Sequence, residues 1–427
     1  MTDFDTTLEF ARSLDAADEL SHFRDKFSIP QDKDGRRCIY VVGNSLGLCP
    51  NEAATVVNEI LTEWGRRGVE GHLEGPRPWL HYHRFATSGF ASMTGSQENE
   101  VVAMNTLTTN LHLMMATFYR PDNKCNKIVI ESTAFPSDYY AVESQIRLHG
   151  YDPGDSLVEW IPRDDERLYI EDLEELLKQH AGEIALMLLP GVQYYSGQVL
   201  DMEALCQLAR KYDCVIGLDL AHAMGNVELR LHDWGPDFAA WCNYKYMNSG
   251  PGAVGGAFVH SRHLDSDGSN HLLGWWGHDI ATRFKMDNKF KPAAGIECWQ
   301  LSNPPALAIA PIIASLGVFE EAGLEALRRK SRVQTEYLKF LIDQYFTGRV
   351  GTITPWDARG CQLSLVITDS NLDARAVFKD LESMNVIGDW REPNVIRIAP
   401  VPLYNSFEDI HELIERMKTA IGDNEKR

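Results

Sequence analysis

Residues 241–246 read Trp241-Cys242-Asn243-Tyr244-Lys245-Tyr246, and they follow the strand end Val215-Ile216-Gly217-Leu218-Asp219. Lys245 is flanked by aromatic side chains where a surface lysine has polar neighbours. Asp219 lies 245 − 219 = 26 residues earlier, which leaves room for one further strand between the two. The sequence therefore predicts that an amine and a carboxylate meet in one crevice, an arrangement suited to covalent chemistry.

This pair matches what pyridoxal phosphate (PLP) requires of a protein. The cofactor's aldehyde needs an amine, for which Lys245 is the candidate. Its pyridine nitrogen needs a carboxylate to stay protonated, for which Asp219 is the candidate. Most lysines near strands are solvated surface groups, so the apolar neighbours of Lys245 carry the inference. We therefore expect a PLP enzyme.

Composition bounds the remaining possibilities. A chain of 427 residues with 44% hydrophobic residues exceeds what one core usually organises, so we expect two domains. The net charge of −20 argues against nucleic-acid or anionic-membrane partners, because both repel an acidic surface. The N-terminus lacks the basic and apolar regions of a signal peptide, so we expect a cytoplasmic protein. Eight cysteines without a Cys-x-x-Cys pair fit buried thiols.

Short apolar runs alternate with amphipathic stretches up to residue 303, which predicts an α/β fold with a mostly parallel sheet. We expect strands at 127–130, 184–189, 214–218, 238–241 and 256–259, and helices near 107–119, 137–149, 171–179 and 201–212. After Asn303-Pro304-Pro305 a long helical region runs to about residue 345. It is followed by a strand at 362–366, a helix near 373–384, a strand at 395–398 and a terminal helix from about 406.

These patterns predict three segments. Residues 46–305 form a large PLP-binding domain, residues 306–427 form a small C-terminal α+β domain, and residues 1–45 form an N-terminal segment that packs with the small domain.

Two further motifs are interpreted as structural. Gly250-Pro251-Gly252-Ala253-Val254-Gly255 satisfies G-x-G-x-x-G, but it opens a strand, whereas a dinucleotide fingerprint opens a helix. His81-Tyr82-His83 has an i, i+2 spacing without a third ligand nearby, and we assign no metal.

Two polar turns are candidates for contacting the cofactor. Asn105-Thr106-Leu107-Thr108-Thr109-Asn110 precedes an amphipathic helix, and a helix start favours a phosphate. Ala134-Phe135-Pro136-Ser137-Asp138 follows a strand and offers a ring to stack on a pyridine and an acid to orient it. Either turn, taken alone, is also consistent with an ordinary helix cap.

Together these motifs resemble the kynureninase family of fold-type I PLP hydrolases. The resemblance spans nearly the whole chain, from residues 43–48 (GNSLGL) through 134–138, 219–223 (DLAHA), 226–229, 231–235, 282–288 and 302–305 to 397–407 (RIAPVPLYNSF). It implies an aspartate aminotransferase-type fold and hydrolytic Cβ–Cγ cleavage of 3-hydroxy-L-kynurenine and L-kynurenine. The products are the aromatic acid and L-alanine, in tryptophan degradation and de novo NAD biosynthesis.

The resemblance also implies roles for individual residues near the cofactor. Lys245 binds its aldehyde and Asp219 its ring nitrogen. The phosphate contacts Leu107, Thr108 and Tyr244, Phe135 stacks on the ring, and Asp138 and His222 lie beside the cofactor. Trp275 and Asn303 reach the site from the neighbouring subunit, which implies a homodimer with active sites at the subunit interface.

Other implied roles concern the substrate. Arg397 binds the α-carboxylate through a bidentate fork, and Tyr244 moves protons at the β-carbon and γ-carbonyl. His72, Ser302 and Asn303 imply that 3-hydroxykynurenine is the better substrate. Pro190 departs from the family pattern and cannot donate a backbone N–H there.

Two other functions remain open on the sequence. Another fold-type I PLP enzyme, a cysteine desulfurase-like lyase or an aminotransferase, would share Lys245 and Asp219. A desulfurase usually needs a cysteine in a mobile loop, whereas Cys361 begins an expected strand. The second possibility is a binding protein that has the same fold but no catalytic activity, and such a protein would not turn over a substrate.

Overall fold

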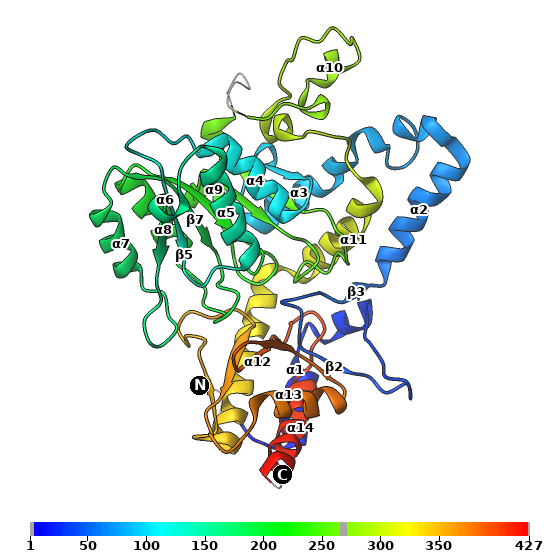
Figure 1. The fold of residues 1–427 in the computed structure, drawn as a ribbon. Helices are drawn as coiled ribbons and strands as arrows, with labels where there is room; N and C mark the ends of the chain where they lie inside the picture. Colours follow the sequence, from blue (N-terminus) through cyan, green and yellow to red (C-terminus); the bar gives the residue numbers. More distant parts are fainter. Residues whose placement is uncertain (1–3, 265–270, 426–427) are drawn as a thin grey trace.

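A mostly parallel sheet forms the centre of the larger lobe (Figure 1). The computed structural model describes residues 4–264 and 271–425. The strand order in this sheet is β4-β10-β9-β8-β7-β5-β6, and every strand except β10 runs in the same direction. Their bounds are β4 (Val101–Ala103), β5 (Lys127–Glu131), β6 (Leu157–Trp160), β7 (Ile184–Pro190), β8 (Val215–Asp219), β9 (Phe238–Trp241) and β10 (Gly256–Val259).

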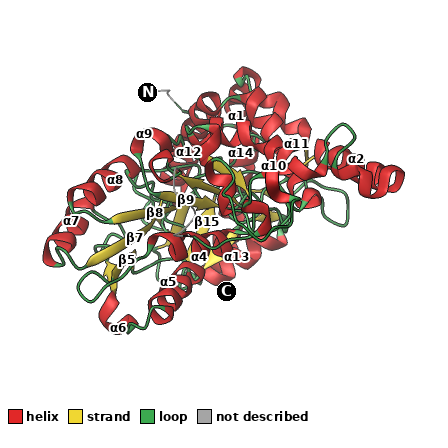
Figure 2. Ribbon diagram, turned by 90° about the horizontal axis from the view of Figure 1, so that it is seen from above, coloured by secondary structure: helices red, strands yellow, loops and turns green. Residues whose placement is uncertain are grey.

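Helices cover both faces of this sheet, which is why its central strands are continuous apolar runs (Figure 2). On β7, Leu186 and Leu188 face the core formed with α4 (Leu107–Phe118) and α5 (Pro136–Leu148). The alternate residues Met187 and Leu189 face the core formed with α7 (Ile170–Gln179), α8 (Met202–Lys211) and α11 (Ala306–Ala322). The sheet is thus the middle of three layers.

A long bent helical segment joins the two lobes. Gly323, with φ of 75°, ends α11 and begins α12 (Leu324–Phe346), which runs down into the smaller lobe (Figure 1). Among the described residues, no single helix is long and apolar enough to cross a membrane. Only α11 and α12 taken together reach that length and composition, and they are bent by 79°.

The smaller lobe contains an antiparallel sheet of order β11-β12-β15-β14. Its strands are β11 (Val350–Thr352), β12 (Leu363–Ile367), β14 (Asp389–Arg391) and β15 (Val395–Ile398). This sheet shares a core with α12, α13 (Ala374–Ser383), α14 (Phe407–Glu425) and α1 (Leu8–Ala17). Asp15 of α1 accepts the N–H groups of Phe407 and Glu408, so the N-terminal helix caps α14.

Short elements complete the fold. In the N-terminal region, β2 (Ile39–Tyr40) pairs in parallel with β13 (Val386–Ile387), and β1 (Phe27–Ser28) pairs with β3 (Cys49–Pro50). The remaining helices are α2 (Glu52–Arg67), α3 (Thr87–Thr94), α6 (Pro153–Ser156), α9 (Leu231–Trp234) and α10 (Ile280–Arg283).

The expected fold class is confirmed, and all seven expected strands lie within one or two residues of their observed bounds. The long helical region is two helices rather than one. Residues 250–255 form a turn in which Gly250 and Gly252 have positive φ, and the chain then enters β10 as expected. Among the elements that the sequence interpretation missed are β4, β6, β11, β14, α1, α2 and α3.

Candidate active site

A cavity of about 300 Å³ opens where β5, β7 and β8 end, and residues of the smaller lobe close its other side. Glu131, Pro190 and Asp219 are the last residues of these three strands, and all three line the cavity. Ligands bind beyond the carboxyl ends of parallel strands in open α/β sheets. Arg391 and Arg397 contribute the wall from the smaller lobe.

Lys245 lies in the turn after β9 and extends its amine into this cavity. Its Nζ is 2.9 Å from Nε2 of His222. Burial first, and the nearby charge of Lys245 next, hold the pKa of His222 well below its usual range. The imidazole is therefore neutral, and its Nε2 accepts a hydrogen bond from the amine.

Three carboxyl groups meet at the base of the cavity. Asp219 ends β8, and its Oδ1 accepts the N–H of Ala221 at 2.7 Å. Burial, followed by the charge and hydrogen bond of Asp219, raises the pKa of Asp138 well above its usual value. Burial also raises the pKa of Glu131 to about 8. Glu131 is therefore protonated at neutral pH, and Asp138 holds its proton well above the pH at which a free aspartate loses it.

The N-terminus of α4 provides a place for an anion. Thr106, Leu107 and Thr108 line the cavity, and the Thr106 side chain makes no capping hydrogen bond, so the first N–H groups of the helix remain available. Oγ1 of Thr108 lies 2.7 Å from Oγ of Ser137. Burial, and then Cys242, raise the pKa of Tyr244, so its phenol is a hydrogen-bond donor at neutral pH.

Two aromatic rings border the space beside the amine. Phe135 is 43% exposed, and Lys245 Nζ lies 6.0 Å from its ring centre. Tyr194 packs edge-on against Phe135 with ring centres 5.3 Å apart. A flat heterocycle can stack on the open face of Phe135.

Arg397 lies on β15 and is 1% exposed. One of its terminal nitrogens donates to the backbone oxygen of Tyr194 at 2.8 Å, and the other pairs with Asp389. Its Nε is buried and has no hydrogen-bond partner among the described residues. Because this donor is unused, Arg397 can still bind a carboxylate.

The structure brings together nine of the thirteen predicted site residues: Leu107, Thr108, Phe135, Asp138, Asp219, His222, Tyr244, Lys245 and Arg397. The other four, His72, Trp275, Ser302 and Asn303, do not line the cavity of their own chain. Trp275 is 45% exposed and contacts Phe284, and His72 packs edge-on against Trp79.

The sequence interpretation gave no individual role to several residues that line the cavity, among them Asn44, Ser45, Glu131, Ser137, Tyr194 and Arg391. Glu131 could have been found because it ends its strand as Asp219 does. Arg391 lies on β14, which was not expected, and therefore had no predicted position.

The residues present fit PLP. The cavity offers the Lys245 amine, the Asp219 carboxyl group, an open aromatic face and free N–H groups at a helix start. In addition, Nδ1 of His222 is buried without a partner among the described residues, which leaves one polar atom for a ligand to satisfy.

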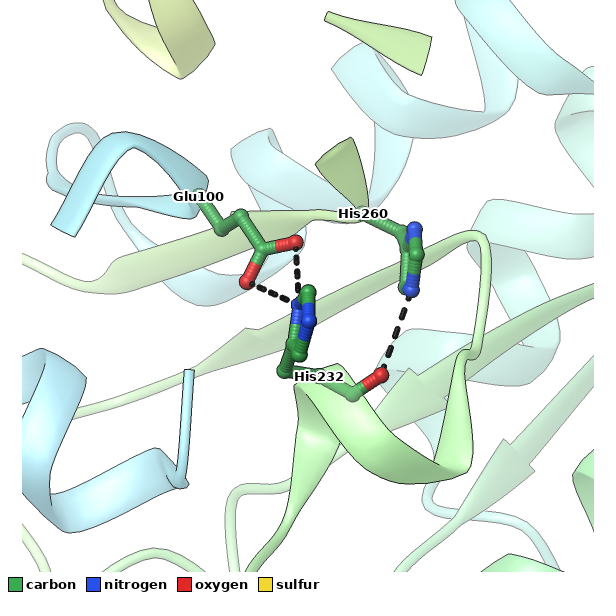
Figure 3. A group of neighbouring side chains, drawn as sticks. All are labelled: Glu100, His232 and His260. Atoms are coloured by element: carbon green, nitrogen blue, oxygen red, sulfur yellow. Dashed lines mark hydrogen bonds and ion pairs between the residues drawn. The ribbon is translucent and has the colours of Figure 1, made fainter. Parts of the chain in front are cut away.

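Glu100, His232 and His260 form a separate cluster that does not line the cavity (Figure 3). His232 Nδ1 lies 2.9 and 3.0 Å from the two oxygens of Glu100, and Nε2 of His260 lies 3.2 Å from the backbone oxygen of His232. The two rings stack with 5° between their planes. Because ring-nitrogen lone pairs lie in the ring plane, these two rings cannot both point at one ion. We assign the cluster a structural role.

Comparisons with known proteins agree with this geometry. The profile of the kynureninase C-terminal domain matches residues 327–417, and that of the class-V aminotransferases matches residues 83–363. Curated kynureninases of Xanthomonas campestris pv. campestris (strain B100) and Xanthomonas oryzae pv. oryzae (strain PXO99A) are 52% and 51% identical to the chain. Each alignment covers 96% of this chain and 97% of the relative. The chain belongs to the kynureninase family. This is a family of PLP-dependent hydrolases.

Solved structures support the fold of this kynureninase-family chain. The cystine C-S lyase C-DES matches with a TM-score of 0.75 and 17% identity, over 89% of this chain and 97% of its own. The cysteine desulfurase CsdA of Escherichia coli matches with a TM-score of 0.75 and 13% identity, over 95% and 98%. A C-DES mutant carries glycine covalently linked to its PLP cofactor. At these identities the likeness concerns the fold alone.

Proposed function

We propose that this protein is a PLP-dependent kynureninase. It hydrolyses the Cβ–Cγ bond of 3-hydroxy-L-kynurenine and L-kynurenine, and it releases the aromatic acid and L-alanine. The observation that carries this proposal is that Lys245, Asp219 and Arg397 face one cavity in a chain 52% identical to curated kynureninases.

Each residue has a defined task in this reaction. PLP, when bound, withdraws electrons from the α- and β-carbons of the substrate. Asp219 keeps a proton on the ring nitrogen, and the amine of Lys245 moves a proton at the α-carbon. The phenol of Tyr244 supplies a proton at the γ-carbonyl. Arg397 binds the α-carboxylate and so orients the bond that breaks.

The cofactor is held by the groups that surround it. The first turn of α4, which contains Leu107 and Thr108, would hold the phosphate together with Tyr244, and Phe135 would stack on the ring. Asp138, whose pKa is raised by burial and by Asp219, donates to Asp219 in its protonated form and keeps that carboxyl group oriented. His222, which lies 2.9 Å from the Lys245 amine, would contact the cofactor there.

Cys361 argues against a cysteine desulfurase. It is 1% exposed, and its backbone N–H is bonded to Oδ1 of Asn226 at 2.9 Å. Burial raises the pKa of its thiol to about 12, so a reactive thiolate is not formed at neutral pH.

We further propose that 3-hydroxykynurenine is the preferred substrate, because His72, Ser302 and Asn303 offer polar groups for the additional ring hydroxyl. These residues and Trp275 reach the cavity of the other subunit in a cytoplasmic homodimer. Large apolar side chains exposed next to them support such an interface: Val69 (80%), Leu73 (70%), Leu273 (52%), Phe284 (58%) and Met286 (72%).

The deciding experiment mixes purified protein, PLP and 3-hydroxykynurenine. We expect 3-hydroxyanthranilate and L-alanine in equal amounts, and none of either from a Lys245→Ala variant. Transfer of the amino group to an added 2-oxo acid, without the aromatic product, would favour an aminotransferase instead.

A further inference from the structure

Two arginines share one aspartate at the small-lobe wall of the cavity. Asp389 pairs through the same oxygen, Oδ2, with Arg397 and, at 3.1 Å, with Arg391. The guanidinium carbons of the two arginines lie 5.9 and 6.0 Å from the ring centre of Tyr194, so both flank the same space. Arg391 and Arg397 line the cavity.

The charges in this cluster have a consequence for anion binding. Arg397 and Asp389, with side chains 1% and 12% exposed, neutralise each other. A carboxylate that joined this pair alone would leave a net negative charge in a region shielded from water, which is costly. Arg391 adds a second positive charge, so the cluster is +1 before the carboxylate binds and neutral afterwards.

Arg391, which lines the cavity, also has an unused hydrogen-bond donor. Its Nε, like that of Arg397, is buried and has no hydrogen-bond partner among the described residues. We propose that Arg391 is a second carboxylate-recognition residue, which makes the neutral Arg397–Asp389 pair able to accept the α-carboxylate of an amino-acid substrate. This inference rests on the proposed function, because it takes Arg397 as the first such residue.

The test compares two ligands that differ in the carboxylate alone. L-Alanine and L-alaninamide are titrated into the PLP-loaded full-length protein, and the cofactor absorbance is followed. Arg391→Gln is expected to weaken L-alanine binding about tenfold or more, the loss typical of a charged hydrogen bond. Binding of L-alaninamide is expected to stay as in the wild type. Arg391→Lys keeps the charge and retains most of the affinity for L-alanine.

A compensating variant separates charge from structure. Asp389→Asn combined with Arg391→Gln returns the cluster to +1, and we expect L-alanine affinity to recover to within about threefold of the wild type. The matched control is Arg375→Gln. Arg375 is another arginine of the small lobe, and its guanidinium lies over Trp390 and Phe378 instead of the cavity. We expect it to leave both affinities unchanged.

Three results would overturn the inference: unchanged L-alanine affinity in Arg391→Gln, equal loss for both ligands, or no recovery in the double variant. A wild type that fails to bind L-alanine overturns it as well. The proposed function fails separately, if the wild type binds L-alanine in this carboxylate-dependent way but releases no aromatic acid from kynurenine.

Discussion

At the scale of single residues, protonation decides what the cavity can do. Asp219, Asp138 and Glu131 would carry three negative charges if all were ionised. Burial raises the pKa of Asp138 well above its usual value and that of Glu131 to about 8, so both groups favour their neutral forms and the repulsion is relieved. Carboxyl groups with strongly raised pKa values in one cavity are typical of a functional site.

The raised pKa of Glu131 makes folding stability depend on pH. The unfolded chain releases this proton near pH 4.5 and the folded chain near pH 8, so stability is lost as pH rises through this window. Glu131→Gln removes the effect. In the cofactor-free protein we expect the variant to match the wild type at pH 4.5. At pH 8.5 it should exceed the wild type by about 3–5 kcal/mol in free energy of unfolding. Urea denaturation at both pH values measures this, and a constant difference would contradict it.

His72 tests the proposed substrate preference. Replacing the imidazole in His72→Phe removes a polar partner for the ring hydroxyl. We expect kcat/KM for 3-hydroxykynurenine to fall about tenfold, while that for kynurenine changes less. Steady-state kinetics with both substrates give the ratio. An equal loss for both substrates would mean that His72 does not contact the hydroxyl.

The sequence predicted site residues whose type the reaction requires. It did not predict residues that line the cavity only because the fold brings them there. Lys245 and Asp219 could be found because each lies next to an apolar strand in a motif of fixed spacing. Tyr194 and Arg391 could not, because a tyrosine in a loop and an arginine among other surface charges carry no signal of their own. Their positions depend on how the two lobes meet.

At the scale of elements, the N-terminal loop fixes the turn that carries Lys245. The N–H of Gly47 donates to the backbone oxygen of Tyr244 at 2.8 Å. A Cβ at Gly47 would lie 2.3 Å from the backbone oxygen of Lys245, closer than atoms can approach. The sequence motif at residues 43–48 therefore has a packing role beside the active site.

Gly47→Ala tests this contact. We expect the turn to shift, the free energy of unfolding to fall by about 1–3 kcal/mol, and the affinity for PLP to fall with it. The control is Gly65→Ala, because Gly65 lies in α2 with open space around it. This control should gain about 0.5–1 kcal/mol and bind PLP normally. Denaturant titration and PLP titration check both variants, and normal PLP binding by Gly47→Ala would count against the role of the loop.

Strands buried on both faces were the most predictable elements. A long apolar run such as residues 184–189 is stable only when both of its faces are buried. In contrast, β4 and β14 contain three residues each and resemble loops in sequence. The break between α11 and α12 depends on Gly323, and the helical pattern continues on both sides of it. Local pattern alone does not locate such a bend.

At the scale of the whole molecule, we propose that residues 1–45 pack with a small domain formed by residues 306–427, and that residues 46–305 form the large domain. Shared core packing of α1 with α14 supports the first part. Although α11 falls within residues 306–427, it packs with the large sheet, so we propose that the transition between the domains runs through α11 and α12 rather than at residue 305.

The proposed dimer predicts complementation between two inactive variants. Lys245→Ala removes the amine of one cavity, and Asn303→Ala removes a group that we expect to serve the neighbouring cavity. A hybrid dimer then has one intact site. Because half of randomly formed dimers are hybrids, mixing refolded or co-expressed variants should restore about a quarter of wild-type activity. No recovery, despite dimers in sedimentation, would mean that each site is built from one chain.

The role of Lys245 as the residue that binds the cofactor is tested most directly by reducing the PLP-loaded protein with borohydride and mapping the modified residue by peptide mass spectrometry. We predict a pyridoxyl phosphate group on Lys245 and on no other lysine, and weaker cofactor binding in the Asp219→Ala variant. A label on another lysine, or no label at all, would contradict it.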